Sequence, residues 1–176
     1  MLLWAVIILT ILERLNELRL TARNHRLALA RGGQEHFPRT YRNMVLMQVF
    51  FFGALILESY PWQPPLDKLT LSCLVALACA QALRYWSIYS LGELWNTRII
   101  VVPGAKVVRD GPYRFMRHPN YLALTMEFLF IPLLARAPIT LLLFSIANLF
   151  ALRQRISCEE QALRENTDYS QKFPKR

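Results

Sequence analysis

The sequence predicts an all-α integral membrane protein with about five transmembrane helices, a short cytoplasmic β-hairpin-like lid and a C-terminal cytoplasmic helix. Apolar residues make up 54% of the 176 positions, and charged residues only 19%. Charge is excluded from long segments, each of which approaches the roughly 17–25 residues that cross a hydrocarbon core. Lysine and arginine concentrate instead in alternate connections between those segments. At this length the chain is expected to form one domain.

Five segments are predicted to span the membrane, and the second has a single ionisable group, Glu58, near its end. The first lacks a basic start and a small-residue cleavage site, so it is interpreted as a span and not as a signal peptide. Only Ala135–Ala137 separates the last two, which are therefore predicted to form a tight helical hairpin. The predicted spans are Met1–Leu18, Met44–Tyr60, Leu66–Leu91, Tyr121–Leu134 and Pro138–Leu152.

The distribution of lysine and arginine predicts the orientation. These residues number six in Arg19–Asn43, five in Gly92–Asn120 and six in Arg153–Arg176, against one each in Pro61–Lys68 and Ala135–Ala137. Basic loops stay on the cytoplasmic side, so we expect the N-terminus outside and the C-terminus inside, in the bacterial inner membrane. The same loops facing anionic lipid account for the net charge of +9, and no nucleic-acid partner is expected.

Several kinds of site are not indicated by the sequence. Cys73 and Cys79 do not share a helical face, and Cys158 is remote from both, so neither a disulfide framework nor a metal-ligand spacing is present. The chain has six glycines and neither a GxGxxG motif nor a phosphate loop, which excludes a Rossmann nucleotide site and an ATPase. No bound metal is expected.

The connection after the third span has a β-type pattern. Thr97–Val102 is rich in β-branched residues, Pro103-Gly104 marks a turn, Lys106–Val108 continues the pattern, and Asp110-Gly111 marks a second turn. A short hairpin that covers the following segment fits this pattern. An ordinary connector between two helices fits it equally well.

The segment GPYRFMRHPNYLALTME, Gly111–Glu127, is basic and aromatic at its start and continues into an apolar helix that Pro119 opens. Tyrosine and arginine also collect at helix ends as simple membrane-interface anchors. A second polar motif favours a site over an anchor. Arg155 and Glu159 are four residues apart on the last helix, a spacing typical of a solvated ion pair. The hairpin of the last two spans nevertheless brings both motifs to one membrane face, where they could surround a zwitterionic cofactor.

Taken together, these motifs resemble the isoprenylcysteine carboxyl methyltransferase family, which is similar to membrane phospholipid methyltransferases and, more distantly, to sterol reductases. The family pattern combines G-x-Y, R-H-P-x-Y, R-x-x-x-E-E and a terminal aromatic pair. The resemblance covers about Thr97 to Pro174. The matching residues of this chain are Gly111-Pro112-Tyr113, Arg117-His118-Pro119-Asn120-Tyr121, Arg155 with Glu159-Glu160, and Tyr169 with Phe173.

The resemblance implies an S-adenosyl-L-methionine site. It implies backbone contacts from Ala105–Val108 to the adenosine, packing of Tyr113 on the cofactor, a turn at His118–Tyr121 that wraps it, and Glu159 at its amino group or ribose hydroxyls. The residues expected to bind the cofactor are Ala105, Lys106, Val107, Val108, Tyr113, Arg117, His118, Pro119, Asn120, Tyr121, Glu159 and Glu160.

The resemblance also implies methyl transfer to an oxygen of a lipophilic substrate, a carboxylate or an acidic enol such as that of a prenylcysteine or an alkylpyrone-like compound. Arg155 is the expected catalytic residue, because a forked and permanently charged guanidinium can align an oxygen that is already ionised. The expected partners are this substrate and membrane lipid. Arg98 departs from the residue type of the family and is not assigned a role.

Acidic residues within the predicted spans raise a separate question, because charge inside a membrane is costly and usually has a partner. Glu13 and Glu17 could belong to a helix that leaves the membrane, or either could line the substrate mouth. Glu127 needs a partner, either Arg84 or the positive sulfonium of the cofactor. Glu13 and Glu127 are therefore further candidates for binding substrate, together with Arg155.

Within the single domain we expect a three-helix half, residues 1–91, and a cofactor-binding half, residues 92–176. Three classes of function stay open. The first is the methyltransferase that the resemblance implies. The second is a membrane reductase of the sterol-reductase type, which the short chain disfavours. The third is a non-catalytic membrane scaffold, which the intact motif residues disfavour.

Overall fold

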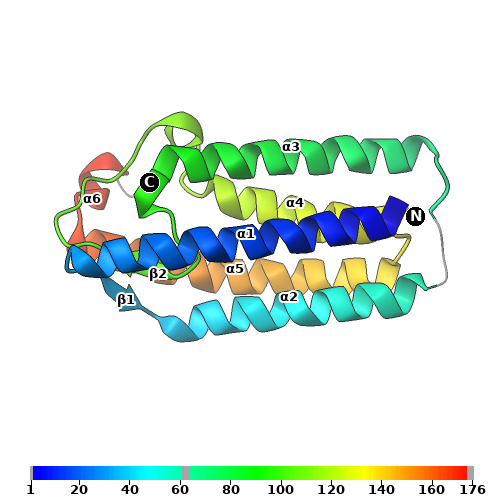
Figure 1. Cartoon of the computed structure of the whole chain (residues 1–176), viewed down its shortest axis with the longest axis horizontal. Helices are drawn as coiled ribbons and strands as arrows, with labels where there is room; N and C mark the ends of the chain where they lie inside the picture. Colours follow the sequence, from blue (N-terminus) through cyan, green and yellow to red (C-terminus); the bar gives the residue numbers. More distant parts are fainter. Residues whose placement is uncertain (1, 61–63, 174–176) are drawn as a thin grey trace.

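The computed structural model describes residues 2–60 and 64–173, so Met1, Pro61 and Pro174, which bound predicted segments, lie outside it. Five long helices lie side by side, and a two-stranded sheet and short helical turns gather at one end (Figure 1). The helices are α1 (Leu2–Ala30), α2 (Pro38–Ser59), α3 (Lys68–Leu91), α4 (Pro119–Leu134), α5 (Pro138–Asn166) and the short α6 (Tyr169–Lys172). The remaining elements are β1 (Gln34–His36), β2 (Ile99–Val101), η1 (Gly92–Leu94) and η2 (Gly111–Arg114).

Helix α1 is longer than the span predicted to end at Leu18, because it continues to Ala30. No glycine or proline interrupts this stretch, and arginine, leucine and alanine are good helix formers. The helix ends where Gly32 adopts a positive φ of 78°. The Gly33 N–H then donates to the Ala28 carbonyl at 2.8 Å, which satisfies one of the free carbonyls at the helix end.

Within the described ranges, three helices are long and apolar enough to cross a membrane: Pro38–Ser59, Lys68–Leu94 and Pro138–Asn166. These correspond to the second, third and fifth predicted spans. Helix α4 is apolar but has only 16 residues, and α1 carries six charged residues between Glu13 and Arg26. That α1 and α4 also cross the membrane stays a prediction. Helix α5 continues well beyond the predicted end at Leu152, as expected for a C-terminal helical extension.

The end of α2, the start of α3 and the α4–α5 connection lie at the same end of the bundle (Figure 1). The Arg136 guanidinium, from the α4–α5 connection, lies 2.6 Å from the carboxylate of Asp67, which caps α3. Glu58 near the end of α2 accepts from the N–H groups of Ile139 at 2.9 Å and Thr140 at 2.7 Å. These bonds hold the predicted α4–α5 hairpin against α2 and α3, and the hairpin itself is confirmed.

The main apolar core contains buried residues of all five long helices, including Ile7 of α1 and Leu77 of α3. The Phe51 ring, 2% exposed, packs 4.5 Å from Phe128 and 5.5 Å from Phe144 between ring centroids. Many leucines on the outer faces, such as Leu57 and Leu142, are strongly exposed, as expected for side chains that face lipid. The end of the bundle that carries the sheet and the short helical turns is therefore supported by a well-packed apolar core.

The mostly helical fold is confirmed, but the predicted hairpin within residues 97–108 is wrong, because the two strands of the sheet come from distant parts of the chain. Strand β2 pairs antiparallel with β1, with Gln34 opposite Val101 and His36 opposite Ile99. Lys106–Val108, the predicted second strand of the hairpin, instead lies near the start of α6, where the Val107 N–H donates to the Asp168 carboxylate at 2.8 Å. The partner of β2 is therefore β1, which lies between α1 and α2, and not the residues that follow β2 in the sequence.

Candidate functional site

The geometry of the motif at Gly111–Tyr121 follows from two local features. Gly111 has a φ of 57°, and a Cβ built on it would lie 2.1 Å from the Ser90 Oγ of α3, so only glycine fits there. Helix α4 begins at Pro119, whose missing N–H is not needed in the first turn. The residue before it, His118, has φ −132° and ψ 62°, outside the helical region as expected before proline.

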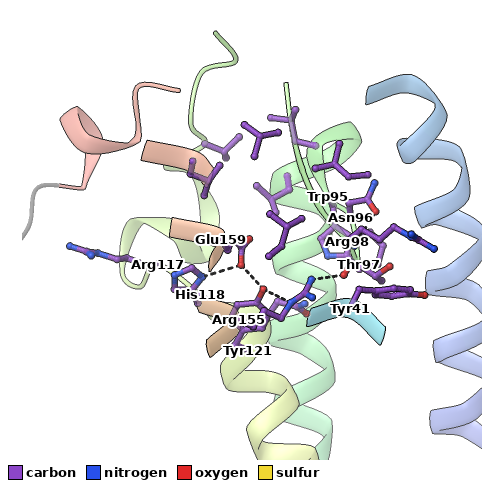
Figure 2. Close-up of a pocket in the computed structure, with 18 of the residues that line it drawn as sticks. Tyr41, Trp95, Asn96, Thr97, Arg98, Arg117, His118, Tyr121, Arg155 and Glu159 are labelled. Atoms are coloured by element: carbon purple, nitrogen blue, oxygen red, sulfur yellow. Dashed lines mark hydrogen bonds and ion pairs between the residues drawn. The ribbon is translucent and has the colours of Figure 1, made fainter. Parts of the chain in front are cut away.

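Tyr121 connects the two polar motifs. Its hydroxyl donates to the Glu159 carboxylate and accepts from the Arg155 Nε at 2.9 Å, as Figure 2 shows. No ion pair joins Arg155 directly to Glu159 among residues 2–60 and 64–173. The predicted proximity of the two motifs is therefore confirmed, but a phenol from α4 lies between the two charged groups of α5.

His118 is held between two carboxylates. Its Nδ1 lies 3.8 Å from Glu159, its Nε2 lies 3.3 Å from Glu160, and its ring stacks on Tyr121 with centroids 5.3 Å apart. Glu160 also accepts from the Tyr169 hydroxyl at 3.0 Å, and it lies 3.3 Å from the Arg117 guanidinium. Glu160 thus connects the turn before α4 with Tyr169 of α6.

A cavity of about 330 Å³ opens beside these motifs. Most of the residues predicted to bind the cofactor or the substrate line it: Ala105, Lys106, Val107, Val108, Tyr113, Arg117, His118, Asn120, Tyr121, Arg155 and Glu159. Pro119, Glu160, Glu13 and Glu127 do not line it. Pro119 and Glu160 support the lining residues from behind, and their predicted contact with a cofactor stays a prediction.

Arg155 is buried in the wall of the cavity, with 5% of its surface exposed. Besides Tyr121, its guanidinium donates to the Thr97 carbonyl at 2.5 Å and to the Thr40 Oγ1 at 3.5 Å. Its five donors form a planar fork, so these acceptors from three different elements fix its orientation. The structure therefore presents Arg155 as a rigid cationic part of the wall, and its predicted contact with substrate stays a prediction.

Two tyrosines of the site remain protonated. Burial, and then the negative charge of Glu159, raise the pKa of Tyr113 well above its usual range. Burial and the charge of Glu160 do the same to the pKa of Tyr169. Both phenols are therefore neutral hydrogen-bonding groups at physiological pH, and neither can serve as a general base there.

The cavity wall also contains residues that the sequence analysis did not assign to the site, such as Tyr41 and Arg98. The Arg98 guanidinium lies 4.6 Å from the Tyr41 ring centroid and 3.0 Å from the Glu35 carboxylate, and both Arg98 and Tyr41 line the cavity (Figure 2). Asn24 donates to the Trp95 carbonyl at 2.8 Å, which attaches α1 to the segment before β2. No local motif marks these positions, because their contacts span more than fifty residues of sequence.

A buried charge network joins α1, α3 and α4 beside the cavity. Glu127 lies 2.9 Å from Arg84 and 2.5 Å from Arg14, and Gln81 donates to its other oxygen at 2.8 Å. Glu17 lies 2.6 Å from Arg14 and 3.3 Å from Arg84. Of the two partners expected for Glu127, the structure supplies Arg84. Of the two acidic residues considered for the substrate mouth, Glu17 lines the cavity and Glu13 does not.

Sequence comparisons identify the class of protein. The isoprenylcysteine carboxyl methyltransferase family matches residues 72–165, just over half of the chain, and the chain belongs to this family. Family membership and the three long apolar helices together define an integral membrane protein of a methyltransferase family.

Two bacterial relatives match most of the length of the chain. The uncharacterized protein YpbQ of Bacillus subtilis (strain 168) is 37% identical over 162 residues, which cover 92% of this chain and 96% of YpbQ. An uncharacterized protein of Haemophilus influenzae (strain ATCC 51907 / DSM 11121 / KW20 / Rd) is 28% identical over 163 residues, covering 92% of this chain and 91% of that protein. No solved structure matches the chain.

Proposed function

We propose that the protein is an S-adenosyl-L-methionine-dependent O-methyltransferase that acts at the membrane on a carboxylate or acidic enol of a lipophilic substrate. The observation that carries this proposal is the bridge from Arg155 through the Tyr121 hydroxyl to Glu159 in the wall of one cavity. A fixed cation that can align a substrate oxygen lies next to a carboxylate that can bind a cationic cofactor, and this arrangement supports the proposal. The cavity volume lies within the roughly 300–1,000 Å³ of small-molecule sites.

The donor set of the cavity suits this cofactor. When bound, the cofactor supplies an activated methyl group on a sulfonium. The Glu159 carboxylate, with its side chain 30% exposed, can accept from an amino group or ribose hydroxyls. Asn120 Oδ1 and Thr97 Oγ1 are buried beside the cavity without a partner among the described residues, so each can receive or share a hydrogen bond with a ligand.

The proposed reaction asks little of the protein in acid–base chemistry. A carboxylate or acidic enol is already ionised near neutral pH, so the main contributions are orientation and exclusion of water. Arg155 supplies orientation because its fork is held by Tyr121 and the Thr97 carbonyl. His118 is engaged by two carboxylates, which supports a positioning role for it.

The apolar side of the cavity supports a lipophilic substrate. Leu18 of α1 and Val45 of α2 both line the cavity, and 46% and 38% of their surfaces are exposed. Met44, Leu91 and Leu124 extend the same apolar wall. We propose that the substrate's chain occupies this side while its acidic oxygen reaches Arg155.

We propose that the end carrying the cavity faces the cytoplasm. In a background without native cysteines, Leu66→Cys is expected to react with a membrane-impermeant thiol reagent added to intact cells. Arg109→Cys, at the opposite end of the bundle, is expected to react only after the cells are opened. Both positions are exposed, so access decides the result. The reverse pattern would place the site on the other side of the membrane.

Calorimetric titration of the purified protein tests the class of reaction. S-adenosylhomocysteine is expected to bind, and NADPH is not. Transfer of labelled methyl groups from S-adenosyl-L-methionine to long-chain acids then tests the chemistry. Binding of NADPH alone would favour a reductase, and binding of neither compound would favour a scaffold.

Arg155→Lys tests the proposed role of the arginine. Lysine keeps the positive charge but loses the planar fork that contacts Tyr121 and Thr97 together. Methyl transfer is expected to fall at least about tenfold, which corresponds to about 1.4 kcal/mol of transition-state stabilisation. Affinity for S-adenosylhomocysteine is expected to stay within about threefold, because Glu159 and the turn before α4 are retained. An equal loss of both would mean that Arg155 acts by bracing the cofactor pocket.

A further inference from the structure

The charge network at the inner end of the cavity belongs to none of the groups that the proposed reaction uses. Three of its members, Arg14, Glu17 and Arg84, line the cavity, and Glu127 supports them from behind. Glu127 lies six residues beyond Tyr121 on α4, so its backbone is about 9 Å deeper along that helix than the backbone of Tyr121, at 1.5 Å per residue. The cavity thus has two polar ends with the apolar Leu124 between them.

Holding the helices together does not by itself account for this network. Replacing a buried ion pair with apolar residues of similar volume is often neutral or stabilising, and charge is especially costly at membrane depth. Here the side chains of Arg84 and Glu17 are only 2% and 8% exposed, and yet both face the cavity. Ionic groups that line a cavity together with the apolar Leu18, Val45 and Leu124 point to a ligand that contacts them.

We propose that Arg14, Glu17 and Arg84 form a second polar subsite, which binds a hydroxyl or carbonyl oxygen of the lipophilic substrate remote from the oxygen that is methylated. This inference rests on the proposed function for the position of the methylated oxygen at Arg155. The two arginines and the two glutamates that bond one another carry no net charge, so the network matches an uncharged polar group better than a second carboxylate. The guanidinium groups can donate to a carbonyl, and Glu17 can accept from a hydroxyl. The substrate class is therefore an oxygenated lipophile and not a plain hydrocarbon-chain acid.

The test compares the binding of two probes, a saturated long-chain carboxylic acid and the same acid with a mid-chain hydroxyl group. Equilibrium binding to the protein in lipid nanodiscs gives the ratio of their affinities. The double variant Arg14→Met/Glu17→Met removes one charge of each sign and leaves the Arg84–Glu127 pair, 2.9 Å apart, in place. The matched control, Arg31→Met/Glu93→Met, removes an ion pair whose side chains are 52% and 47% exposed and which lies outside the cavity lining.

The wild type and the control are expected to favour the hydroxylated acid at least tenfold more than the double variant does. Partitioning of each probe into lipid is common to all three proteins, so it cancels when the ratios are compared. The same ratio in wild type and double variant, within twofold, would overturn the subsite. Should the double variant fail thermal unfolding controls, Glu17→Gln, which keeps the side-chain shape, is expected to lower the ratio in the same direction, and an unchanged ratio would overturn the subsite.

Methyl transfer to the two probes is measured in parallel and tests only the proposed function. A hydroxyl preference that depends on Arg14 and Glu17, without methyl transfer, would contradict the O-methyltransferase and leave the subsite standing. Methyl transfer without a hydroxyl preference that depends on Arg14 and Glu17 would support the O-methyltransferase and contradict the subsite.

Discussion

Glu127→Ala is expected to lower the free energy of unfolding in detergent by about 3–5 kcal/mol, the usual cost of removing one partner of a buried ion pair. The Glu127 side chain is 4% exposed and lies within 3 Å of both Arg14 and Arg84. Its removal leaves two guanidinium groups, with side chains 17% and 2% exposed, whose remaining ion-pair partner within residues 2–60 and 64–173 is Glu17. Equilibrium unfolding followed by circular dichroism measures the effect.

Leu129→Ala provides the control on the same helix. Leu129 is 38% exposed on the outer surface and takes no part in the network. Its truncation is expected to change the free energy of unfolding by less than about 1 kcal/mol, as for most substitutions away from buried features. Equal effects of the two substitutions would show that Glu127 contributes only packing volume, and the ionic account of how α1 is attached to α3 and α4 would be wrong.

Glu159→Ala is expected to weaken binding of S-adenosylhomocysteine by about 1.5–3 kcal/mol, the usual contribution of a hydrogen bond to a charged group. This corresponds to a rise in Kd of roughly tenfold to 150-fold. Glu159 lines the cavity, and its side chain is 30% exposed, so the carboxylate is accessible to a ligand while it also accepts from Tyr121. Calorimetric titration of wild type and variant gives the two affinities.

Glu165→Ala is the matched control, because Glu165 is an exposed carboxylate on the same helix whose hydrogen bond is to Gln161 on its own helix face. Its removal is expected to leave cofactor affinity within about twofold and to leave stability unchanged. Unchanged affinity in Glu159→Ala as well would limit Glu159 to orienting Tyr121 and His118, and would remove it from the proposed cofactor site.

Much of the helical framework was predictable from local features of the chain. Continuous apolar segments indicate α2, α3 and α5 directly, and three residues between two apolar segments leave room only for a tight hairpin. Pro119 and Pro138 each open a helix at its first position, where proline costs nothing. The convergence of the Arg117–Tyr121 motif with Arg155 and Glu159 also followed, because the hairpin connects the helices that carry them.

The tertiary structure decided how the polar groups pair. The Arg155–Glu159 spacing predicts a direct pair, but the Tyr121 hydroxyl from α4 lies between them. That outcome depends on how two helices are rotated about their axes, which local spacing does not specify. Strand β2 likewise has only three residues, too few for its own pattern to select a partner, so its pairing with β1 was settled by where α1 ends.

The sequence by itself determined the three long apolar helices α2, α3 and α5, because hydropathy, proline positions and loop lengths are properties of contiguous segments. The sequence indicated Arg84 as one of two partners for Glu127, but only the tertiary structure decided that Arg14 and Glu17 join them in one network. Those charges become compatible with a buried position when three helices bring opposite signs within hydrogen-bond distance. The distances between polar groups on helices that are far apart in the chain are set by the packing of those helices. This packing depends on side chains from several segments together, so no single segment predicts it.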